Sequence, residues 1–249
     1  MAARRSTRWS RIEREARETY GDLIAGVDEV GRGPLAGPVV ACAVVMPPDR
    51  RAIPGVDDSK RLTPAQREIL AVRIRSRALA VALGAASAGE IDRLNIYHAT
   101  ALAMRRALSR LGLTPHHVIV DGKPIRTLGV AHSAVVGGDG SCYSVACASI
   151  VAKVVRDRLM ERLARRYPGY GWERNVGYGT PLHLDALDRL GATPHHRRSF
   201  CVRQLSLALG GLREREEQEP AGDPRDRVER NERETPGAPA RSRKPGATG

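Results

Sequence analysis

The sequence predicts an α/β domain that is built on a mixed β-sheet flanked by helices. Two observations support this fold class. Apolar runs that read as strands come first along the chain, and the later ones alternate with helical patterns. A run of strands followed by strands that alternate with helices is typical of a sheet with both antiparallel and parallel neighbours. The chain of 249 residues is long enough to bury a substantial core.

The first half of the chain is expected to supply three strands and one helix. Three apolar runs are predicted strands: residues 23–27, 39–46 and 79–86. Pro47 and Pro48 end the second run, because proline cannot donate a hydrogen bond to a neighbouring strand. Pro64–Arg77 is a predicted helix, since Thr63 suits the N-cap and Pro64 suits the first helical position.

The second half is expected to alternate between helices and strands. Ser87 or Ala88 opens a long helix that ends near Gly112. Four segments follow as strand, strand, helix and helix: residues 117–120, 131–136, 144–166 and Pro181–Leu190. The last of them belongs to a small helical C-terminal extension.

Composition divides the chain into three parts. Residues 1–19 contain six Arg and three Glu with little apolar content, so we expect a basic, partly disordered arm. Residues 20–211 are expected to form the folded domain, including its C-terminal helical part. Residues 212–249 contain no aromatic residue and one Val, and they cannot bury enough apolar surface to offset the entropy lost on ordering. We therefore expect a disordered, charged tail.

The charge of the chain favours a polyanionic partner. Lys and Arg total 41 against 28 acids, which gives a formal net charge of +13. Residues 212–249 contain nine basic and nine acidic residues, so the whole excess lies in the first 211. A basic domain most often binds nucleic acid, although the Arg bias of a GC-rich genome can produce the same composition.

Other features of the composition favour a cytoplasmic protein. The four cysteines show no CxxC spacing, which is typical of a reduced protein with small buried thiols. No apolar segment approaches the length that spans a bilayer, so we expect no membrane contact.

Acidic residues beside glycine end three apolar segments: VDEVGRG, IVDGK and VVGGDG. They contribute Asp28, Glu29, Asp121 and Asp139. A single such end is ordinary, because Asp-Gly is a common turn pair. Three of them in a positively charged domain favour a site for hard divalent cations such as Mg²⁺, which prefer carboxylate and water ligands. Two such ions can activate a water molecule and stabilise the leaving oxygen of a phosphodiester.

The first of these ends poses a geometric condition. Neighbouring residues of a regular strand point to opposite faces, so Asp28 and Glu29 can share a site only if the strand ends or twists between them. Gly31 makes such a change of direction feasible. Gly31 and Gly33 also lack Cβ atoms, so a ligand can approach their backbone closely, and Arg32 adds a positive charge.

In six blocks the chain resembles the bacterial type 2 ribonucleases H (ribonuclease HII): AGVDEVGRGPLAGPVVACAVV, DDSKRLTPAQRE, ASAGEIDRLNIYHATALAM, VIVDGKP, GGDGSCYSVACASIVAKVVRDRLM and GYGTPLH…PHHRRSF. The blocks run in order from residue 23 to residue 202. The resemblance implies a ribonuclease H-like fold with a mixed five-stranded sheet. It also implies an enzyme that needs Mn²⁺ or Mg²⁺, with two ions during catalysis, and whose metal-binding acids are Asp28, Glu29, Asp121 and Asp139.

The resemblance also implies a substrate and residues that bind it. The implied activity is cleavage on the 5′ side of a ribonucleotide, in RNA–DNA hybrids and at single ribonucleotides in duplex DNA, leaving 3′-hydroxyl and 5′-phosphate ends. Gly31, Arg32 and Gly33 match the segment that recognises the 2′-hydroxyl, and Tyr178 matches a tyrosine that stacks on a sugar. Two further residues are weaker candidates for substrate contact: Lys60 near the phosphates, and His183, which suits a structural role at a helix start equally well.

Two other functions stay open at this point. One is a different ribonuclease H-like nuclease, such as a resolvase or an exonuclease. The other is a catalytically silent protein that binds nucleic acid through its basic surface. A need for divalent metal during turnover would separate an enzyme from a silent binder.

Some features outside the acids carry weaker expectations. The segment from Gln204 to Leu207 resembles short peptides that dock on the bacterial sliding clamp, although a terminal turn covering the core explains it more simply. Arg156 and Asp157 are expected to form a local ion pair at the surface. We expect the protein to be a monomer.

Overall fold

The structure is a computed structural model, and it describes residues 10–200 of the chain. Its centre is a five-stranded sheet with the strand order β3-β2-β1-β4-β5. The strands have these bounds: β1 Ile24–Val30, β2 Val39–Val45, β3 Ala80–Ala86, β4 His117–Asp121 and β5 His132–Val135. Strands β1, β2 and β3 pair antiparallel, whereas β4 pairs parallel with both β1 and β5. The mixed five-stranded sheet that we predicted is therefore confirmed.

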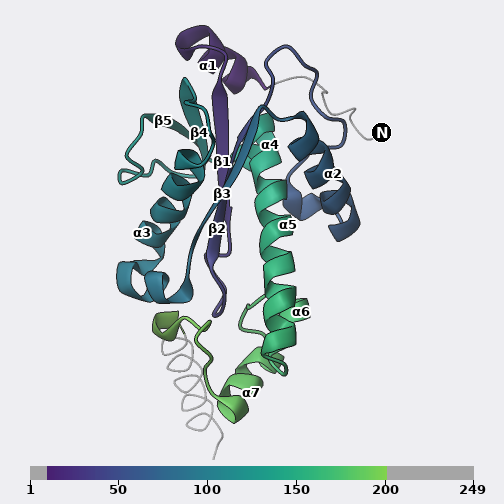
Figure 1. The fold of residues 1–249 in the computed structure, drawn as a ribbon, viewed down its shortest axis with the longest axis vertical. Coiled ribbons are helices and arrows are strands. Elements are labelled where there is room, and N and C mark those ends of the chain that lie inside the picture. The colour runs from purple at the N-terminus through teal and green to yellow at the C-terminus, as the bar shows by residue number, and fades with distance from the viewer. Residues whose placement is uncertain (1–9, 201–249) are drawn as a thin grey trace, which may run out of the picture. The chain divides into compact units, whose positions relative to one another are not determined.

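Helices cover both faces of this sheet (Figure 1). Their bounds are α1 Arg11–Tyr20, α2 Pro64–Arg77, α3 Ala88–Ser109, α4 Gly138–Ser141, α5 Tyr143–Arg166, α6 Trp172–Asn175 and α7 Pro181–Leu190, with a short 3-10 helix at Ser59–Arg61. Helix α3 packs on one face, while α5 and α2 pack on the other. Alternate side chains of β2 enter the two layers, since Ala41 and Ala43 join the α3 layer whereas Cys42 and Val44 join the α5 layer.

Side-chain caps explain why several helices begin where the sequence predicted. Thr63 and Gln66 form a reciprocal capping box at the start of α2, and Ser87 and Glu90 form another at the start of α3. The long helix that we predicted from Ser87 onward is, however, interrupted at Asn95, whose φ is +65°. The Asn95 carboxamide accepts hydrogen bonds from the backbone N–H groups of Tyr97 and His98, so Asn95 caps the second part of the helix.

The N-terminal segment differs from the expected disordered arm over residues 11–19. These residues form helix α1, whose capping box joins Ser10 and Glu13. The Glu13 carboxylate is fully buried and accepts hydrogen bonds from the backbone N–H groups of Tyr143 and Ser144 at the start of α5. The segment is therefore held by this buried polar contact together with the packing of Ile12 and Ala16 against the residues that include Ile24 and Val145.

The small helical extension that we predicted follows α5 (Figure 1). Helices α6 and α7 pack around Trp172 and Tyr170, and Met160 of α5 contributes to the same cluster. The predicted boundary at residue 212 and the segment from Gln204 to Leu207 lie outside the described residues. Within residues 10–200, none of the helices has the length and apolar character that crossing a membrane requires.

Candidate active site

Two parallel strands place three of the four predicted acids close together. Asp28 and Glu29 lie near the carboxyl end of β1, and Asp121 is the last residue of β4, which pairs parallel with β1. The carboxyl ends of adjacent parallel strands meet at one edge of a sheet, a common place for a functional site. Asp139 arrives differently from our expectation, since it lies in the one-turn helix α4 rather than at the end of a strand.

We expected Asp28 and Glu29 to share a site only if the strand ended or twisted between them. The strand does not end there. Pairing between β1 and β2 continues through both residues, with Asp28 opposite Cys42 and Glu29 opposite Ala41. The two side chains therefore leave opposite faces of the strand. Each of them nevertheless interacts electrostatically with Asp121, which belongs to the neighbouring strand.

Burial, and to a lesser extent neighbouring carboxylates, raises the pKa of Asp28 and of Glu29. Asp28 is only 5% exposed, and burial raises its pKa well above the ordinary value, with further increases from the charges of Glu29 and Asp121. Burial also raises the pKa of Glu29, and the nearby Arg32 opposes that change. The chain thus holds carboxyl groups close together where their ionised forms are disfavoured, which a protein core has no need to do.

Each acid has specific hydrogen-bond or ion-pair partners. The Asp28 carboxylate accepts a hydrogen bond from the Glu29 N–H at 2.7 Å, and the Asp121 carboxylate accepts one from the Gly138 N–H at 2.7 Å. The other two acids, Glu29 and Asp139, each form an ion pair with a cationic side chain. Lys60 Nζ lies 3.1 Å from Asp139, and an Arg32 guanidinium nitrogen lies 3.3 Å from Glu29.

The donor set fits a hard divalent cation by chemistry, because it consists of carboxylate oxygens with no thiol or imidazole among them. The carboxylates do not converge as ligands, since nowhere in residues 10–200 are three or more His, Cys, Asp or Glu side chains grouped so as to hold a metal ion. Two of the four acids are instead paired with Lys60 and Arg32. The four acids therefore lie around one edge of the sheet, and two of them form ion pairs with cationic side chains.

The glycines after β1 have different roles. Gly31 is buried, has a φ of +91°, and a Cβ there would lie 2.1 Å from Arg156 Nε. Its missing side chain thus makes room for Arg156, and the approach of a ligand to its backbone stays a prediction. Gly33 is exposed, and a Cβ there would meet only the Tyr178 ring, at 3.6 Å. Gly33 and Tyr178 therefore face each other at the surface.

Two buried arginines, Arg197 and Arg156, donate hydrogen bonds to the segment that contains these glycines. The sequence predicted this role for neither of them. Arg197 donates hydrogen bonds to the carbonyl oxygens of Gly31, Arg32 (2.8 Å) and Gly37 (3.0 and 2.8 Å). Both arginines are fully buried, although arginine is rarely buried in proteins.

Arg156 holds the same segment from the opposite direction. Its guanidinium donates to the carbonyl oxygens of Ala36 (3.2 Å), Pro38 (3.0 Å) and Val176 (3.0 Å). The expected surface pair of Arg156 with Asp157 is therefore wrong, and Asp157 pairs with Lys153 at 2.8 Å instead. Arg156 thus connects the glycine segment to the residues just before Tyr178.

The remaining candidates differ in exposure. Tyr178 is 47% exposed and the Lys60 side chain is 80% exposed, so both can reach a macromolecular substrate. His183 is fully buried, and its two ring nitrogens contact Tyr178, Trp172 and His196. The expectation that His183 contacts substrate is therefore wrong for its side chain, which has no access to the surface.

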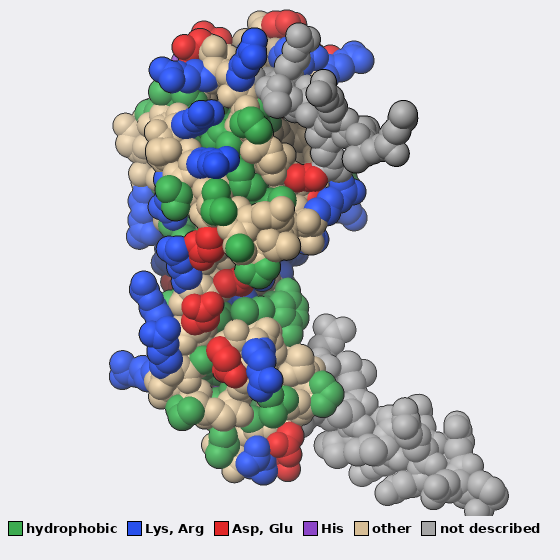
Figure 2. All heavy atoms as spheres, turned by 90° about the vertical axis from the view of Figure 1, so that its right-hand side faces the viewer, with side chains coloured by type: hydrophobic (Ala, Val, Ile, Leu, Met, Phe, Trp, Pro, Cys, Tyr) green, Lys and Arg blue, Asp and Glu red, His purple; other side chains and the backbone are tan. Residues whose placement is uncertain are grey.

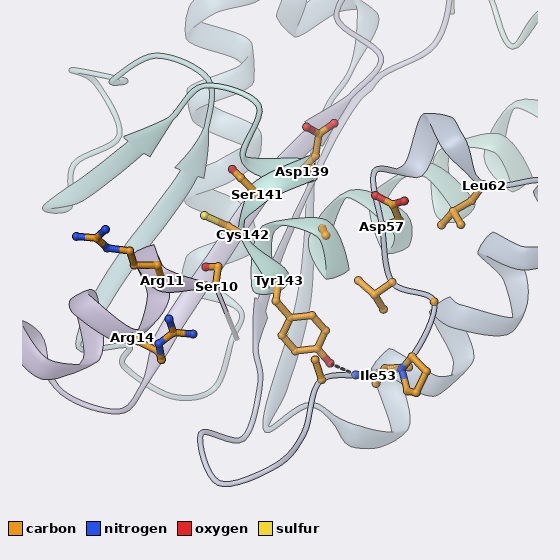
Figure 3. Close-up of a pocket in the computed structure, with 16 residues that line it drawn as sticks. Ser10, Arg11, Arg14, Ile53, Asp57, Leu62, Asp139, Ser141, Cys142 and Tyr143 are labelled. Atoms are coloured by element: carbon orange, nitrogen blue, oxygen red, sulfur yellow. Dashed lines mark hydrogen bonds between the residues drawn. The ribbon is translucent and has the colours of Figure 1, made fainter. Parts of the chain in front are cut away.

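A cavity of about 500 Å³ lies next to this edge of the sheet (Figure 3). Its walls include Arg11 and Arg14 of α1, Ile53, Tyr143 and, at one end, Asp139. Asp139 is the only one of the four acids in the wall. The other three acids lie outside this cavity, and Asp28 and Asp139 are both buried.

Comparison with known proteins identifies the family. The sequence model described as Ribonuclease HII matches residues 25–204. The chain is 55% identical to the ribonuclease HII of Granulibacter bethesdensis, over 78% of this chain and 90% of that one. It is 57% identical to the ribonuclease HII of Thermosynechococcus vestitus, over 71% and 83% of the two chains.

Solved structures agree with these relatives. The ribonuclease H2 of Pyrococcus horikoshii superposes with a TM-score of 0.62 at 30% identity, over 72% of this chain and 95% of that one. Ribonuclease HII from Archaeoglobus fulgidus, solved in complex with PCNA, superposes with a TM-score of 0.59 at 26% identity, over 71% and 94% of the two chains. The resemblance that we noted in the sequence is confirmed, and this chain belongs to the ribonuclease HII family of nucleases, which cleave the RNA strand of RNA–DNA hybrids.

Proposed function

We propose that this chain hydrolyses the phosphodiester on the 5′ side of a ribonucleotide, both in RNA–DNA hybrids and at single ribonucleotides in duplex DNA. The products are 3′-hydroxyl and 5′-phosphate ends. One observation carries the proposal. A cluster of acids at the carboxyl ends of β1 and β4 is followed at once by Gly33, which faces the exposed ring of Tyr178. Hydrolytic groups and a surface for a sugar thus adjoin each other.

The acids Asp28, Glu29, Asp121 and Asp139 are the proposed ligands of the divalent metal that enzymes of this family use. We propose two ions, Mg²⁺ or Mn²⁺, which when bound activate a water molecule and stabilise the departing 3′-oxygen. Lys60 and Arg32 now neutralise Asp139 and Glu29. The Lys60 and Arg32 side chains are both exposed, so each could leave its carboxylate and bind a substrate phosphate if the carboxylates bound metal.

Discrimination between RNA and DNA is assigned to the glycine segment and Tyr178. The 2′-hydroxyl is the group that separates the two nucleic acids at a given sugar. Gly33 leaves the surface open at that position, and Tyr178 supplies an aromatic ring next to it. Gly31 and Arg197 support this surface from below, since the Gly31 carbonyl accepts a hydrogen bond from Arg197.

Affinity for the duplex is assigned to basic side chains outside the site. Figure 2 shows Lys and Arg distributed over the face that carries α2, with acidic side chains between them. Phosphate contacts of this kind supply affinity without distinguishing RNA from DNA.

A contact with a sliding clamp is proposed as a second interaction. The Archaeoglobus ribonuclease HII was solved in complex with PCNA. In this chain, the segment from Gln204 to Leu207 resembles peptides that bind the bacterial sliding clamp. Saturable binding of the bacterial clamp to a peptide with the sequence of residues 203–211 would support the contact, and its absence would exclude this segment.

The test of the main proposal uses a labelled DNA duplex with one internal ribonucleotide, incubated with Mg²⁺ or with EDTA. We expect a single cut on the 5′ side of the ribonucleotide, lost in EDTA. Asp121→Asn should reduce the rate by orders of magnitude, because it removes a charged ligand while its amide oxygen can still accept the Gly138 N–H. Gly33→Ala should reduce cleavage by placing a methyl group where the sugar lies.

Two variants serve as matched controls. Asp185→Asn changes an exposed carboxylate on α7, and Gly89→Ala adds a methyl group in open space at the start of α3. Both should cleave like the wild type. Equal cutting of an all-DNA duplex would refute the role of the glycine segment, and near-normal activity of Asp121→Asn would refute the metal assignment. Binding without cutting would make the silent binding protein the better description.

A further inference from the structure

A buried cluster of polar rings lies directly beneath Tyr178. His183, His196 and Trp172 are at most 2% exposed, and they come from α7, the segment after α7, and α6. The ring nitrogens of the two histidines lie 3.0 Å apart, and Trp172 Nε1 lies 3.0 Å from His183 Nε2. The proposed function leaves these groups without a role.

The contacts determine where the protons are. The Thr193 N–H donates to His196 Nδ1 at 2.9 Å, and the Thr193 hydroxyl, which can also donate, lies 2.9 Å from the same nitrogen. With Nδ1 as the acceptor, the proton of neutral His196 is on Nε2. That proton and the Trp172 N–H both point at His183 Nε2 and share its single lone pair. His183 must then carry its own proton on Nδ1, which donates to the Tyr178 carbonyl at 2.8 Å. The hydrogen bonds therefore run in one direction, from Thr193 to Tyr178.

The histidines are neutral at physiological pH, as this arrangement requires. Burial lowers the pKa of His183, and burial together with the neighbouring His183 lowers the pKa of His196 to about 4. A protonated ring would place two N–H groups against each other between the histidines.

The last hydrogen bond of the series fixes the backbone of Tyr178. Its carbonyl also accepts from the Thr180 N–H at 2.8 Å, and its own N–H donates to the Asn175 carbonyl at 2.9 Å. The peptide groups on both sides of the residue are thus held, while the ring is 47% exposed. The backbone of Tyr178 is therefore fixed from beneath, and its ring lies beside Gly33.

We propose that His183 and His196 are positioning residues, which hold the Tyr178 carbonyl so that the Tyr178 ring stands beside Gly33 for the sugar of the substrate. This inference rests on the proposed function for the role of Tyr178, but the positioning itself is a property of the free protein. Apolar side chains could fill the same volume without burying polar atoms. What the histidines add is a fixed direction at Tyr178.

The first test needs no activity. Nitrogen-15 NMR of the imidazoles in the wild-type protein should show the Nδ1–H form for His183 and the Nε2–H form for His196. The Tyr178 ring should show a nuclear Overhauser effect to the α protons of Gly33, which His183→Leu removes. The control is His117→Asn, which alters a buried histidine on β4 that is bonded to Ser133. The His117→Asn variant should retain the nuclear Overhauser effect between Tyr178 and Gly33. The opposite tautomers, or an unchanged Tyr178–Gly33 contact in His183→Leu, would overturn the proposal.

The second test is a double-mutant cycle on the duplex with one ribonucleotide. His183→Leu should lower kcat/KM by about tenfold when Tyr178 is present, and by less than about twofold in a Tyr178→Ala background, because the two residues act together. His183→Asn, which keeps a donor near the position of Nδ1, should restore part of the activity. His117→Asn should give the same fold-change in both backgrounds.

The outcomes separate this inference from the proposed function. Equal losses for His183→Leu in both backgrounds would refute positioning while leaving the nuclease assignment intact. If the wild type failed to prefer the ribonucleotide, the proposed function would fail, and the NMR result would still decide whether the histidines position Tyr178.

Discussion

At the scale of single residues, Asp28 is a carboxylate that folding alone would not place where it lies. Its pKa is raised by burial and by the charges of Glu29 and Asp121. A raised pKa in the folded state means that the ionised form destabilises the fold, most fully at pH values above that pKa. Asp28→Asn should therefore raise the melting temperature in EDTA at pH 8, by roughly 2–4 °C for each kcal/mol relieved, while abolishing cleavage.

Circular dichroism during heating measures this effect. Asp185→Asn is the matched control, because Asp185 is exposed and forms an ion pair with Arg189, and its loss should leave the melting temperature unchanged or slightly lower. A melting temperature of Asp28→Asn below that of the wild type would contradict the expected stabilisation.

The sequence revealed the acids but not the residues that support the site. Asp28, Glu29 and Asp121 stand beside glycines at the ends of apolar runs, and this local pattern survives in the fold. Arg156 and Arg197 gave no such signal, because a buried arginine that donates to backbone carbonyls has the same local sequence as an exposed one. The contact of Gly31 with Arg156 was hidden for the same reason, since Arg156 is 125 residues away in the numbering of the chain.

At the scale of elements, helix α1 depends on a single buried carboxylate. Glu13 accepts hydrogen bonds from the Tyr143 N–H (3.0 Å) and from the Ser144 N–H and hydroxyl (both 2.6 Å). It thus caps α5 across 130 residues of sequence, at an end where the helix dipole favours negative charge. Glu13→Ala should reduce the free energy of unfolding by about 2–4 kcal/mol, because it leaves several buried donors without an acceptor.

Urea unfolding of the full chain measures the loss. Glu15→Ala is the control, since Glu15 lies on the same helix but forms an exposed ion pair with Arg11. Its effect should stay within about 0.5 kcal/mol. Similar losses in the two variants would show that Glu13 contributes only helix propensity.

The sequence contained one signal for this helix that composition obscured. The spacing of Ser10 and Glu13 is that of a capping box, but the segment looked like a solvated arm because its buried group is charged. The break of α3 at Asn95 was concealed by the apolar pattern rather than by charge. The apolar pattern continues on both sides, and only the side chain of Asn95 shows that a second helix begins there.

At the scale of the whole molecule, the substrate-facing surface joins segments that are far apart in the sequence. Leu35 and Ala36 donate to the Gly177 carbonyl, Gly37 donates to the His195 carbonyl, and Arg197 donates back to Leu35. Periodicity predicts the strands and helices that flank these segments, but not a contact across 140 residues or more. Only the resemblance to a family indicated that the glycine segment and Tyr178 belong to one site.

The buried histidines give the whole domain a predictable pH dependence. The pKa of His196 is about 4 in the folded state, against an ordinary value of 6.5. Between these values the unfolded chain binds a proton that the folded chain does not, so stability falls as the pH is lowered from 6.5 toward 4. One such proton changes the unfolding free energy by up to about 1.4 kcal/mol per pH unit. Asp28 and Glu29, whose pKa values are raised, act in the opposite sense, so the comparison of a variant with the wild type is needed.

His196→Gln should therefore reduce the slope of unfolding free energy against pH in this window, even though the variant is less stable at pH 7. The slope is measured by urea unfolding at several pH values from 4 to 7. His183 and His195 face His196 within the same cluster, and His183 also has a lowered pKa. His183 and His195 should therefore preserve part of the pH dependence of the unfolding free energy in the His196→Gln variant. A slope equal to that of the wild type would mean that His196 can be protonated in the folded protein. The hydrogen bonds that run from Thr193 to Tyr178 would then not require a neutral ring.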